Sequence, residues 1–197
     1  KGVPEVIMRE YSESGSVVAS KIFKSGMVMR KGVMGEDGLE QGHWEEYYSC
    51  PPPCASGSGP LKSKGNYRDG KREGAWIFYY ETGAVEQQGN YVSGKPEGAW
   101  KWFFSGGSTL REETYLGGLE TGYMKEYGDS GNVVAEGNYT AGKKTGAWKY
   151  SVHGYRSEGG YEEGKEQGEW KQYAENGNLI FSGGYDTGLE TGLHRFF

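Results

Sequence analysis

The sequence predicts an all-β fold, an elongated single-layer antiparallel sheet of repeated β-hairpins. Three observations predict it. A motif of fixed internal spacing recurs at a period of 24 residues, short aromatic-rich segments end in Gly-containing turns, and no segment shows a helical hydrophobic period of 11 residues or more. In such a fold each repeat buries its apolar surface only against its neighbours, as in solenoid proteins.

The repeated motif is a Tyr, two residues, a Gly, three residues, a second Gly, one residue and then usually a Trp. From Gly42 to Gly192 the second Gly recurs at steps of 32, 24, 24, 24, 22 and 24 residues. Met124 and His194 take the place of the Trp in two copies. The residues that we assign to the repeat framework are Trp44, Trp76, Trp100, Trp148, Trp170, Tyr67, Tyr91, Tyr115, Tyr139, Tyr161 and Tyr185.

We predict a single repeat domain over residues 1–197. Residues 1–41 carry the repeat in a weaker form and are expected to be degenerate N-terminal cap units, because the end of a solenoid has no neighbour. Residues 42–197 carry the regular repeats. A Pro/Gly-rich insertion at residues 50–59 is expected to be a loop, since three prolines do not fit into a sheet ladder.

Each regular unit is expected to hold two strands joined by a turn such as Glu81-Thr82-Gly83, whose Gly has a positive φ. A further Gly lies inside the second strand, for example Gly137 and Gly183, and we expect an aromatic ring of the adjacent strand to lie across it. The three residues between the two motif glycines are interpreted as loops. Three of these loops carry a leucine, which we interpret either as drift among solvent loops or as a binding edge: Leu39, Leu119 and Leu189.

Composition restricts the classes of partner. The chain has 22 basic and 27 acidic residues, a net charge of −5, and no basic run longer than two residues. Nucleic acid is therefore not expected as a partner, and membrane lipid is disfavoured. The three histidines lie in different units, and paired acids such as Glu112-Glu113 place neighbouring side chains on opposite faces of a strand. We expect no cofactor, no metal and no enzymatic activity.

Two cysteines, Cys50 and Cys54, flank three prolines. A local disulfide, free thiols and a metal site are all open. An extended polyproline segment would hold the two Cα atoms about 12 Å apart, whereas a disulfide needs roughly 4.4 to 6.8 Å, so a bridge requires a sharp turn. A bridge would favour an exported protein, periplasmic or on the cell surface, over a cytoplasmic one.

The motif Tyr-x-x-Gly-x-x-x-Gly-x-Trp, followed by Tyr-x-x-x-Gly, resembles the MORN repeat, and more closely its 24-residue bacterial variant. The resemblance covers about residues 32–197 and is interrupted at residues 50–59. It implies a MORN-like solenoid that acts as a scaffold beside its partners, and bacterial arrays of this variant are often labelled antitoxin-like. MORN proteins with lipid kinase or methyltransferase activity carry a separate catalytic segment, and none fits in this chain.

We therefore expect a non-enzymatic repeat scaffold that mediates protein–protein interaction, as a monomer or an edge-to-edge dimer. The alternative is a cell-wall or carbohydrate-binding repeat module of an exported protein. Choline-binding hairpin arrays, which the sequence is similar to in this respect, also show Trp, paired Tyr and Gly at a period near 20. That alternative needs aromatic cages between successive hairpins, whereas here the period is 24 and the two motif glycines bracket a four-residue step.

Overall fold

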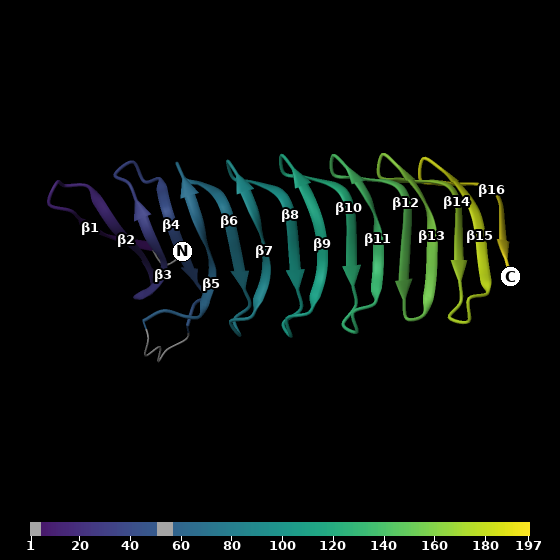
Figure 1. The fold of residues 1–197 in the computed structure, drawn as a ribbon, viewed down its shortest axis with the longest axis horizontal. Coiled ribbons are helices and arrows are strands. Elements are labelled where there is room, and N and C mark those ends of the chain that lie inside the picture. The colour runs from purple at the N-terminus through teal and green to yellow at the C-terminus, as the bar shows by residue number, and fades with distance from the viewer. Residues whose placement is uncertain (1–4, 51–56) are drawn as a thin grey trace. The chain divides into compact units, whose positions relative to one another are not determined.

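The computed structural model describes residues 5–50 and 57–197, which form strands and turns and contain no helix. None of these residues belongs to a helix that could cross a membrane. The chain divides into two compact units, residues 1–97 with 105–107 and residues 98–104 with 108–197. Within each unit the strands pair antiparallel in chain order and form a single layer (Figure 1).

The first unit contains seven strands in its described residues, and the eighth begins in it. The bounds are β1 Glu5–Tyr11, β2 Val17–Lys24, β3 Met27–Met34, β4 Glu40–Tyr47, β5 Leu61–Arg68, β6 Lys71–Tyr79, β7 Val85–Val92 and β8 Lys95–Phe103. The second unit continues from Gly98 of β8. It adds β9 Thr109–Leu116, β10 Leu119–Tyr127, β11 Val133–Thr140, β12 Lys143–Val152, β13 Tyr155–Glu162, β14 Lys165–Tyr173, β15 Leu179–Asp186 and β16 Leu189–Phe196.

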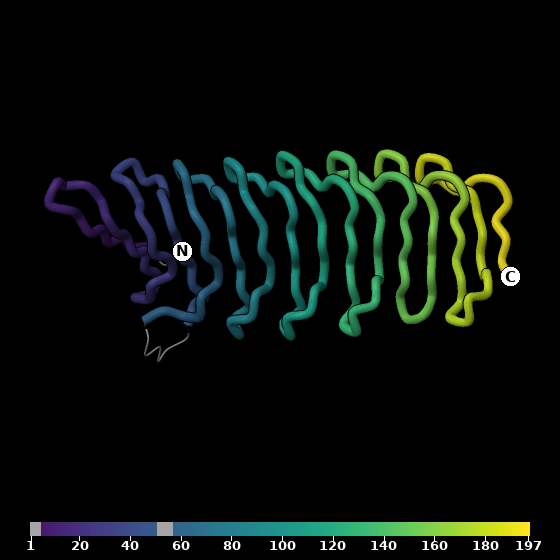
Figure 2. The backbone as a smooth tube through the Cα atoms, viewed as in Figure 1, coloured from purple at the N-terminus to yellow at the C-terminus, as the bar shows by residue number. Residues whose placement is uncertain are grey.

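The predicted all-β class, with repeated hairpins in a single antiparallel layer, is confirmed. Figure 2 shows the backbone of each unit passing through successive hairpins, with turns at both ends of the strands. The single repeat domain over residues 1–197 stays a prediction.

The first motif Gly lies in a two-residue turn. Asp69 and Gly70 join β5 to β6, and both have positive φ, 51° and 71°. This is the combination that a type I′ hairpin turn requires, and its twist matches that of the flanking strands. The loops predicted between the two motif glycines are therefore wrong, because pairing resumes directly after the turn. Lys71 already begins β6, and Leu119 already begins β10.

The second motif Gly lies at a bulge inside the strand. Gly74 of β6 has φ 69°. Glu73 pairs with Asn66 of β5 and Trp76 pairs with Gly65, so Gly74 and Ala75 have no partner on β5. A bulge of this kind re-aims the side chain that follows it. Here it turns the indole of Trp76 onto the backbone of β5.

The tryptophan rings lie across glycines of the preceding strand. A Cβ on Gly65 would lie 2.4 Å from Cδ2 of Trp76, and a Cβ on Gly137 would lie 2.2 Å from Cδ2 of Trp148. The predicted ring over an in-strand Gly is confirmed at Gly137. It is confirmed also at Gly183, where the ring of the adjacent strand is that of His194, and Phe181 of the same strand lies close as well.

Each indole also makes a hydrogen bond at the bulge. Trp76 Nε1–H donates to the carbonyl of Asn66 at 3.0 Å, and Trp148 Nε1–H donates to that of Asn138 at 3.1 Å. The accepting residue belongs to the part of the preceding strand that faces the bulge. The indole therefore satisfies a backbone acceptor where the ladder is interrupted.

At the opposite end of the strands the usual turn is longer. Tyr80 N–H donates to the carbonyl of Ala84 at 2.9 Å, and Gly83 has φ 88°, as predicted for this Gly. The β12–β13 connection is an exception, because His153 and Gly154 make a two-residue turn with φ 50° and 82°. This shorter connection accounts for the step of 22 residues in the sequence.

The N-terminal strands continue the same packing. Ile22, Met34 and Trp44 form a buried cluster, with Tyr67 packed against it. In the predicted insertion, residues 51–56 lie outside the described residues. The base of the insertion is closed by a hydrogen bond from Tyr48 N–H to the carbonyl of Pro60, 2.9 Å long.

Candidate functional site

The face of the sheet that carries the motif tryptophans is called here the tryptophan face. Its indole rings are almost completely buried: Trp44 and Trp76 are 0% exposed, Trp148 1%, Trp100 3% and Trp170 9%. The motif tyrosines are partly exposed beside them. The Trp rings therefore belong to the buried framework. The tyrosines are the rings of this aromatic row that solvent and a ligand can reach.

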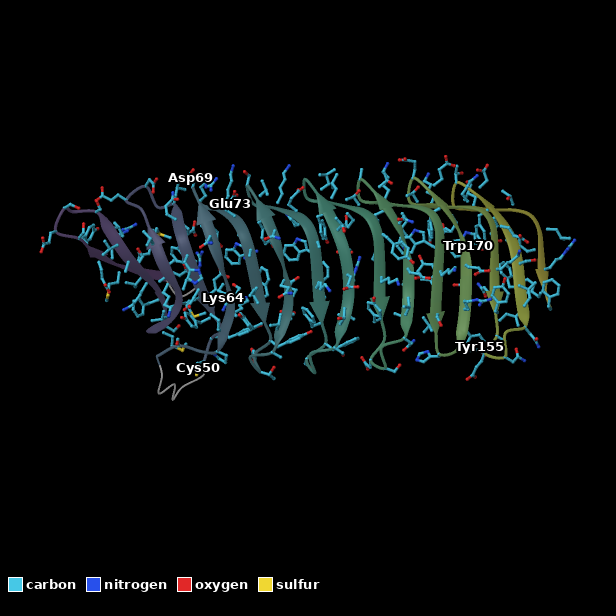
Figure 3. The ribbon with its side chains drawn as sticks, viewed as in Figure 1. Cys50, Lys64, Asp69, Glu73, Tyr155 and Trp170 are labelled. Atoms are coloured by element: carbon cyan, nitrogen blue, oxygen red, sulfur yellow. The ribbon has the colours of Figure 1, made fainter. Side chains whose placement is uncertain are left out.

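Tyrosine and tryptophan rings meet edge to face. The Tyr67 centroid lies 5.0 Å from that of Trp76 at an interplanar angle of 88°. Tyr139 and Trp148 are 5.2 Å apart at 86°. This is the arrangement that aromatic quadrupoles favour, and each such pair adds about 0.5–1.5 kcal/mol beyond area burial. Figure 3 labels Trp170, which lies over the strands, and Tyr155, which lies beside the β12–β13 turn.

Cationic side chains lie over these rings. The guanidinium carbon of Arg72 is 4.5 Å from the centroid of Trp76, and Lys144 Nζ is 4.5 Å from that of Trp148. Lys144 Nζ also donates to the hydroxyl of Tyr150 at 2.7 Å. Burial lowers the pKa of Lys144 from its ordinary value, and Glu166 partly opposes this effect. Through these cation–π contacts the long cationic side chains cover the aromatic rings.

In the first unit these charges are balanced. Arg30 pairs with Glu40 at 3.0 Å and with Glu46 at 3.4 Å. Arg72 lies 4.0 Å from the other oxygen of Glu46. Two guanidinium groups thus face two carboxylates, and the hydroxyls of Ser63 and Tyr67 donate to Glu46 as well.

One hairpin of the second unit departs from the pattern. Glu113 of β9 takes the place of the in-strand Gly, and Met124 of β10 takes the place of the Trp. Met124 is 4% exposed and Glu113 is 5% exposed. A Met side chain is narrower than an indole and adapts its shape, so the site can hold the carboxylate that an indole would displace. A Gly-to-Glu change is thereby accommodated through a Trp-to-Met change on the next strand.

The Glu113 carboxylate is held by two neighbours on the same strand. Arg111 Nη2 lies 2.5 Å from Glu113 Oε2, and the Tyr115 hydroxyl donates to Glu113 Oε1. Burial, followed by this hydrogen bond to Glu113, raises the pKa of Tyr115 well above its usual value. Tyr115 therefore stays protonated and remains a donor over the whole physiological range.

A shallow pocket opens around this cluster. Its lining residues come from β8, β9 and β10, and we call it the Glu113 pocket: Trp102, Leu110, Arg111, Glu113, Tyr115, Glu120 and Glu126. The centroids of Trp102 and Tyr115 are 6.5 Å apart, and the guanidinium carbon of Arg111 is 5.9 Å from that of Trp102. Glu113 is already engaged by a guanidinium and a phenol, so it positions these two side chains. The pocket offers two ring surfaces and two further carboxylates.

The predicted binding edge is distributed over both units. Leu39 precedes β4 in the first unit and is 40% exposed, whereas Leu119 and Leu189 begin β10 and β16 of the second unit and are 51% and 71% exposed. Leu119 pairs with Leu116 across the β9–β10 turn, and Leu116 is 67% exposed. The structure thus places two exposed leucines at one hairpin tip, of which the sequence reasoning named one.

The remaining candidates do not come together. Cys50 lies three residues after the end of β4 (Figure 3). Cys54 lies outside the described residues, so the disulfide stays a prediction. His194 takes the position of a motif Trp, with Nε2 3.1 Å from the carbonyl oxygen of Gly184. Among residues 5–50 and 57–197, no three His, Cys, Asp or Glu side chains form a group that could hold a metal ion.

The sequence reasoning missed the Glu113 pocket. The signal was present, because alignment of the repeats places Glu113 at the position of Gly89 and Gly137, and Met124 at that of the Trp. The two changes are 11 residues apart in the chain. Their link is visible once the strands are paired, since a motif Trp lies directly across its Gly.

A known family of repeats matches the chain at the hairpins that carry the motif. The MORN repeat variant family matches three segments, residues 72–93, 120–141 and 166–186. They start 48 and 46 residues apart, which is every second repeat, and each covers one hairpin: β6–β7, β10–β11 and β14–β15. No curated protein matches the chain. Repeats of this family are generally associated with scaffolds that bind proteins or membranes. With the hairpin fold and the spaced motif, these matches show that the chain carries MORN repeats of the variant type.

Proposed function

We propose that this protein is a non-enzymatic scaffold that binds a partner protein. The observation that carries the proposal is the exposed leucine pair at the β9–β10 tip, Leu116 at 67% and Leu119 at 51%. Exposed apolar side chains at a turn do not contribute to the framework, whose rings are buried on the tryptophan face. The tip is thus available for contact with an apolar surface.

The surface chemistry supports a protein rather than a phosphate-rich partner. The net charge of −5 opposes binding to nucleic acid and to anionic lipid. Partly exposed groups of the tryptophan face include the motif tyrosines, Arg72 and Trp102, which are residue types enriched at protein interfaces. We expect the interface to bury more than about 1,000 Å² in total, the lower range of specific complexes.

A pull-down from the native organism with matched variants tests the proposal. Leu119→Asp and Leu189→Asp are expected to reduce the recovered partner at least about tenfold, since a carboxylate buried at an interface costs more than 1.4 kcal/mol. Lys165→Asp is the control, because Lys165 has the repeat position of Leu119 and is also exposed. Light scattering on the unliganded protein distinguishes the monomer from an edge-to-edge dimer.

Two results would contradict this proposal. One is an equal loss of partner in the lysine control, which would indicate a general charge effect. The other is full recovery of the partner with both leucine variants, which would place the contact elsewhere on the molecule.

A carbohydrate-binding role is the second candidate function. It is supported by a shallow pocket of the second unit that combines aromatic rings with hydrogen-bonding side chains, among them Tyr150, Tyr155, Arg156, Gln172 and Tyr173. Tyr155 is 58% exposed and suits stacking against a sugar ring. Retention of the protein on native cell-wall glycans, with loss of retention in Tyr155→Ala and no protein partner recovered, would favour this function over the first.

A further inference from the structure

The Glu113 pocket has an excess of negative charge. Three carboxylates, those of Glu113, Glu120 and Glu126, line it with one guanidinium, that of Arg111. Arg111 pairs with Glu113. Within the described part of the chain, no cation lies within 4.0 Å of the side-chain oxygens of Glu120 or Glu126. The corresponding cluster of the first unit has two cations, Arg30 and Arg72, for two carboxylates. Lys144 has the repeat position of Arg72, and with Lys144 counted the second unit has two cations for three carboxylates.

Lys144 is attracted by Glu126, but it forms no ion pair within 4.0 Å with a carboxylate of the pocket. Lys144 of β12 lies over the rings of Trp148, Tyr150 and Tyr161, and its ammonium group donates to the Tyr150 hydroxyl. It is held there by these aromatic neighbours. The carboxylates of Glu120 and Glu126 remain partly exposed and available to a cation from outside.

The floor of the pocket is a buried and partnered carboxylate. Oε2 of Glu113 lies 2.5 Å from Arg111 Nη2, and Oε1 accepts a hydrogen bond from the Tyr115 hydroxyl. Glu113 is 5% exposed, and it is one of the residues that line the pocket.

The walls of the pocket suit an organic cation. Trp102 and Tyr115 supply ring surfaces, and a cationic nitrogen within about 6 Å of such a ring is attracted by the ring quadrupole. In residues 5–50 and 57–197 the carboxylates do not converge into a group of metal-binding geometry. A long side chain with an apolar stem and a charged end matches rings and spread carboxylates better than a compact ion does.

We propose that the Glu113 pocket binds a lysine or arginine side chain of a partner protein. The charged end interacts with Glu120 and Glu126, and the stem packs against Trp102 and Tyr115. This inference rests on the proposed scaffold function and adds the chemistry of the partner: its contact segment exposes a basic residue. The Glu113–Arg111–Tyr115 cluster forms the floor of the pocket.

Titration of the 15N-labelled protein with small cations tests the pocket directly. The probes are n-butylguanidinium and n-butylammonium chloride, and pentan-1-ol is the neutral analogue of similar length. Both cations are expected to shift the indole N–H resonance of Trp102 in a saturable way, and pentan-1-ol is expected to leave it unchanged. The resonance is assigned from its disappearance in Trp102→Phe.

A double variant tests the role of the carboxylates. Glu120→Gln with Glu126→Gln is expected to weaken the binding of both cations at least about tenfold, because it removes the charged acceptors of the cation. Glu190→Gln is the matched control, because Glu190 has the repeat position of Glu120 and a side chain that is 71% exposed. Circular dichroism verifies the fold. If the double variant does not fold, Glu126→Gln alone is used, with a loss of at least about threefold expected.

Several outcomes would overturn the inference. They are absence of saturable shifts with either cation, equal binding of pentan-1-ol, unchanged binding in the carboxylate variants, and competition by micromolar Ca²⁺, which would indicate a metal site. The proposed function is tested separately. A partner that is lost with Leu119→Asp but retained in full by the carboxylate variants would leave the scaffold function intact and reject the basic side chain.

Discussion

At the scale of single residues, the important contact is that of an aromatic ring with a bare glycine backbone. Trp148 is 1% exposed, covers Gly137 and donates its indole N–H to Asn138. The sequence predicted a ring at Gly137 because a Gly inside a strand often marks a close approach. It did not predict the hydrogen bond, because the indole reaches that carbonyl only after the bulge has turned the strand.

The first prediction concerns this contact. Trp148→Ala is expected to lower the free energy of unfolding by about 3–5 kcal/mol, since it leaves a cavity and an unsatisfied carbonyl. Chemical denaturation measures the change. Tyr155→Ala serves as the control: its ring is 58% exposed, and its removal should cost less than about 1 kcal/mol. Comparable losses for both variants would mean that the burial of the indole is not what stabilises the sheet.

The same contact can be tested from the glycine side. Gly137→Ala would place a Cβ 2.2 Å from Cδ2 of Trp148, and we expect a loss of about 1–3 kcal/mol from overpacking. At Gly106 a Cβ would meet nothing within 4 Å, so Gly106→Ala is expected to be close to neutral. A neutral Gly137→Ala would show that the ring can move away without cost.

At the scale of the hairpin, two backbone features recur in each regular repeat, a turn and a bulge. A two-residue turn with positive φ at both positions joins the strands, and a Gly bulge four residues after the turn Gly turns the Trp inward. The positions of the turn Gly and the bulge Gly were visible in the sequence as the two glycines of the motif. We predicted loops between the two glycines, polar in some repeats and carrying a leucine in others. The turn itself needs only two residues, so those three residues pair as strand.

The second prediction concerns a turn residue. Ala141 has φ 48°, a conformation that is unfavourable for Ala and that Asn adopts more readily. Ala141→Asn is therefore expected to raise the free energy of unfolding by about 0.5–1 kcal/mol, measured by thermal or chemical unfolding. Thr140→Asn, one residue earlier in β11, should not stabilise the protein. An Ala141→Asn variant with lower stability would contradict the type I′ assignment.

At the scale of the whole molecule, stability depends on many partly buried tyrosines. Burial, as the largest cause, raises the pKa above the ordinary value of 10.0 at Tyr67, Tyr115, Tyr139, Tyr150 and Tyr161. In the unfolded chain these phenols ionise near the ordinary value. Their contribution to stability is thus complete below about pH 10 and is lost as the pH rises toward their folded-state pKa values.

The third prediction is cooperative unfolding at alkaline pH. We expect the far-ultraviolet circular dichroism signal of the sheet to be lost above about pH 10, in one transition with the tyrosinate absorbance at 295 nm. Tyr123 is expected to contribute as well, because its hydrogen bond to Glu136, followed by burial, raises its pKa to about 12. Tyr155, whose ring is 58% exposed, is the control, and Tyr155→Phe should leave the midpoint almost unchanged. Ionisation of all tyrosines near pH 10 with the sheet intact would refute the prediction.

The sequence by itself determined the repeat, its period, the strand class and the residues of the ladder. Each of these depends on neighbours within one or two hairpins, so local spacing encodes them. Only the tertiary structure decided which side chains meet across strands. It placed Glu113 opposite Met124, paired Leu116 with Leu119 and turned the predicted loops into strands. The physical reason is that two-residue turns and bulges fix the register, and register determines which substitutions face each other.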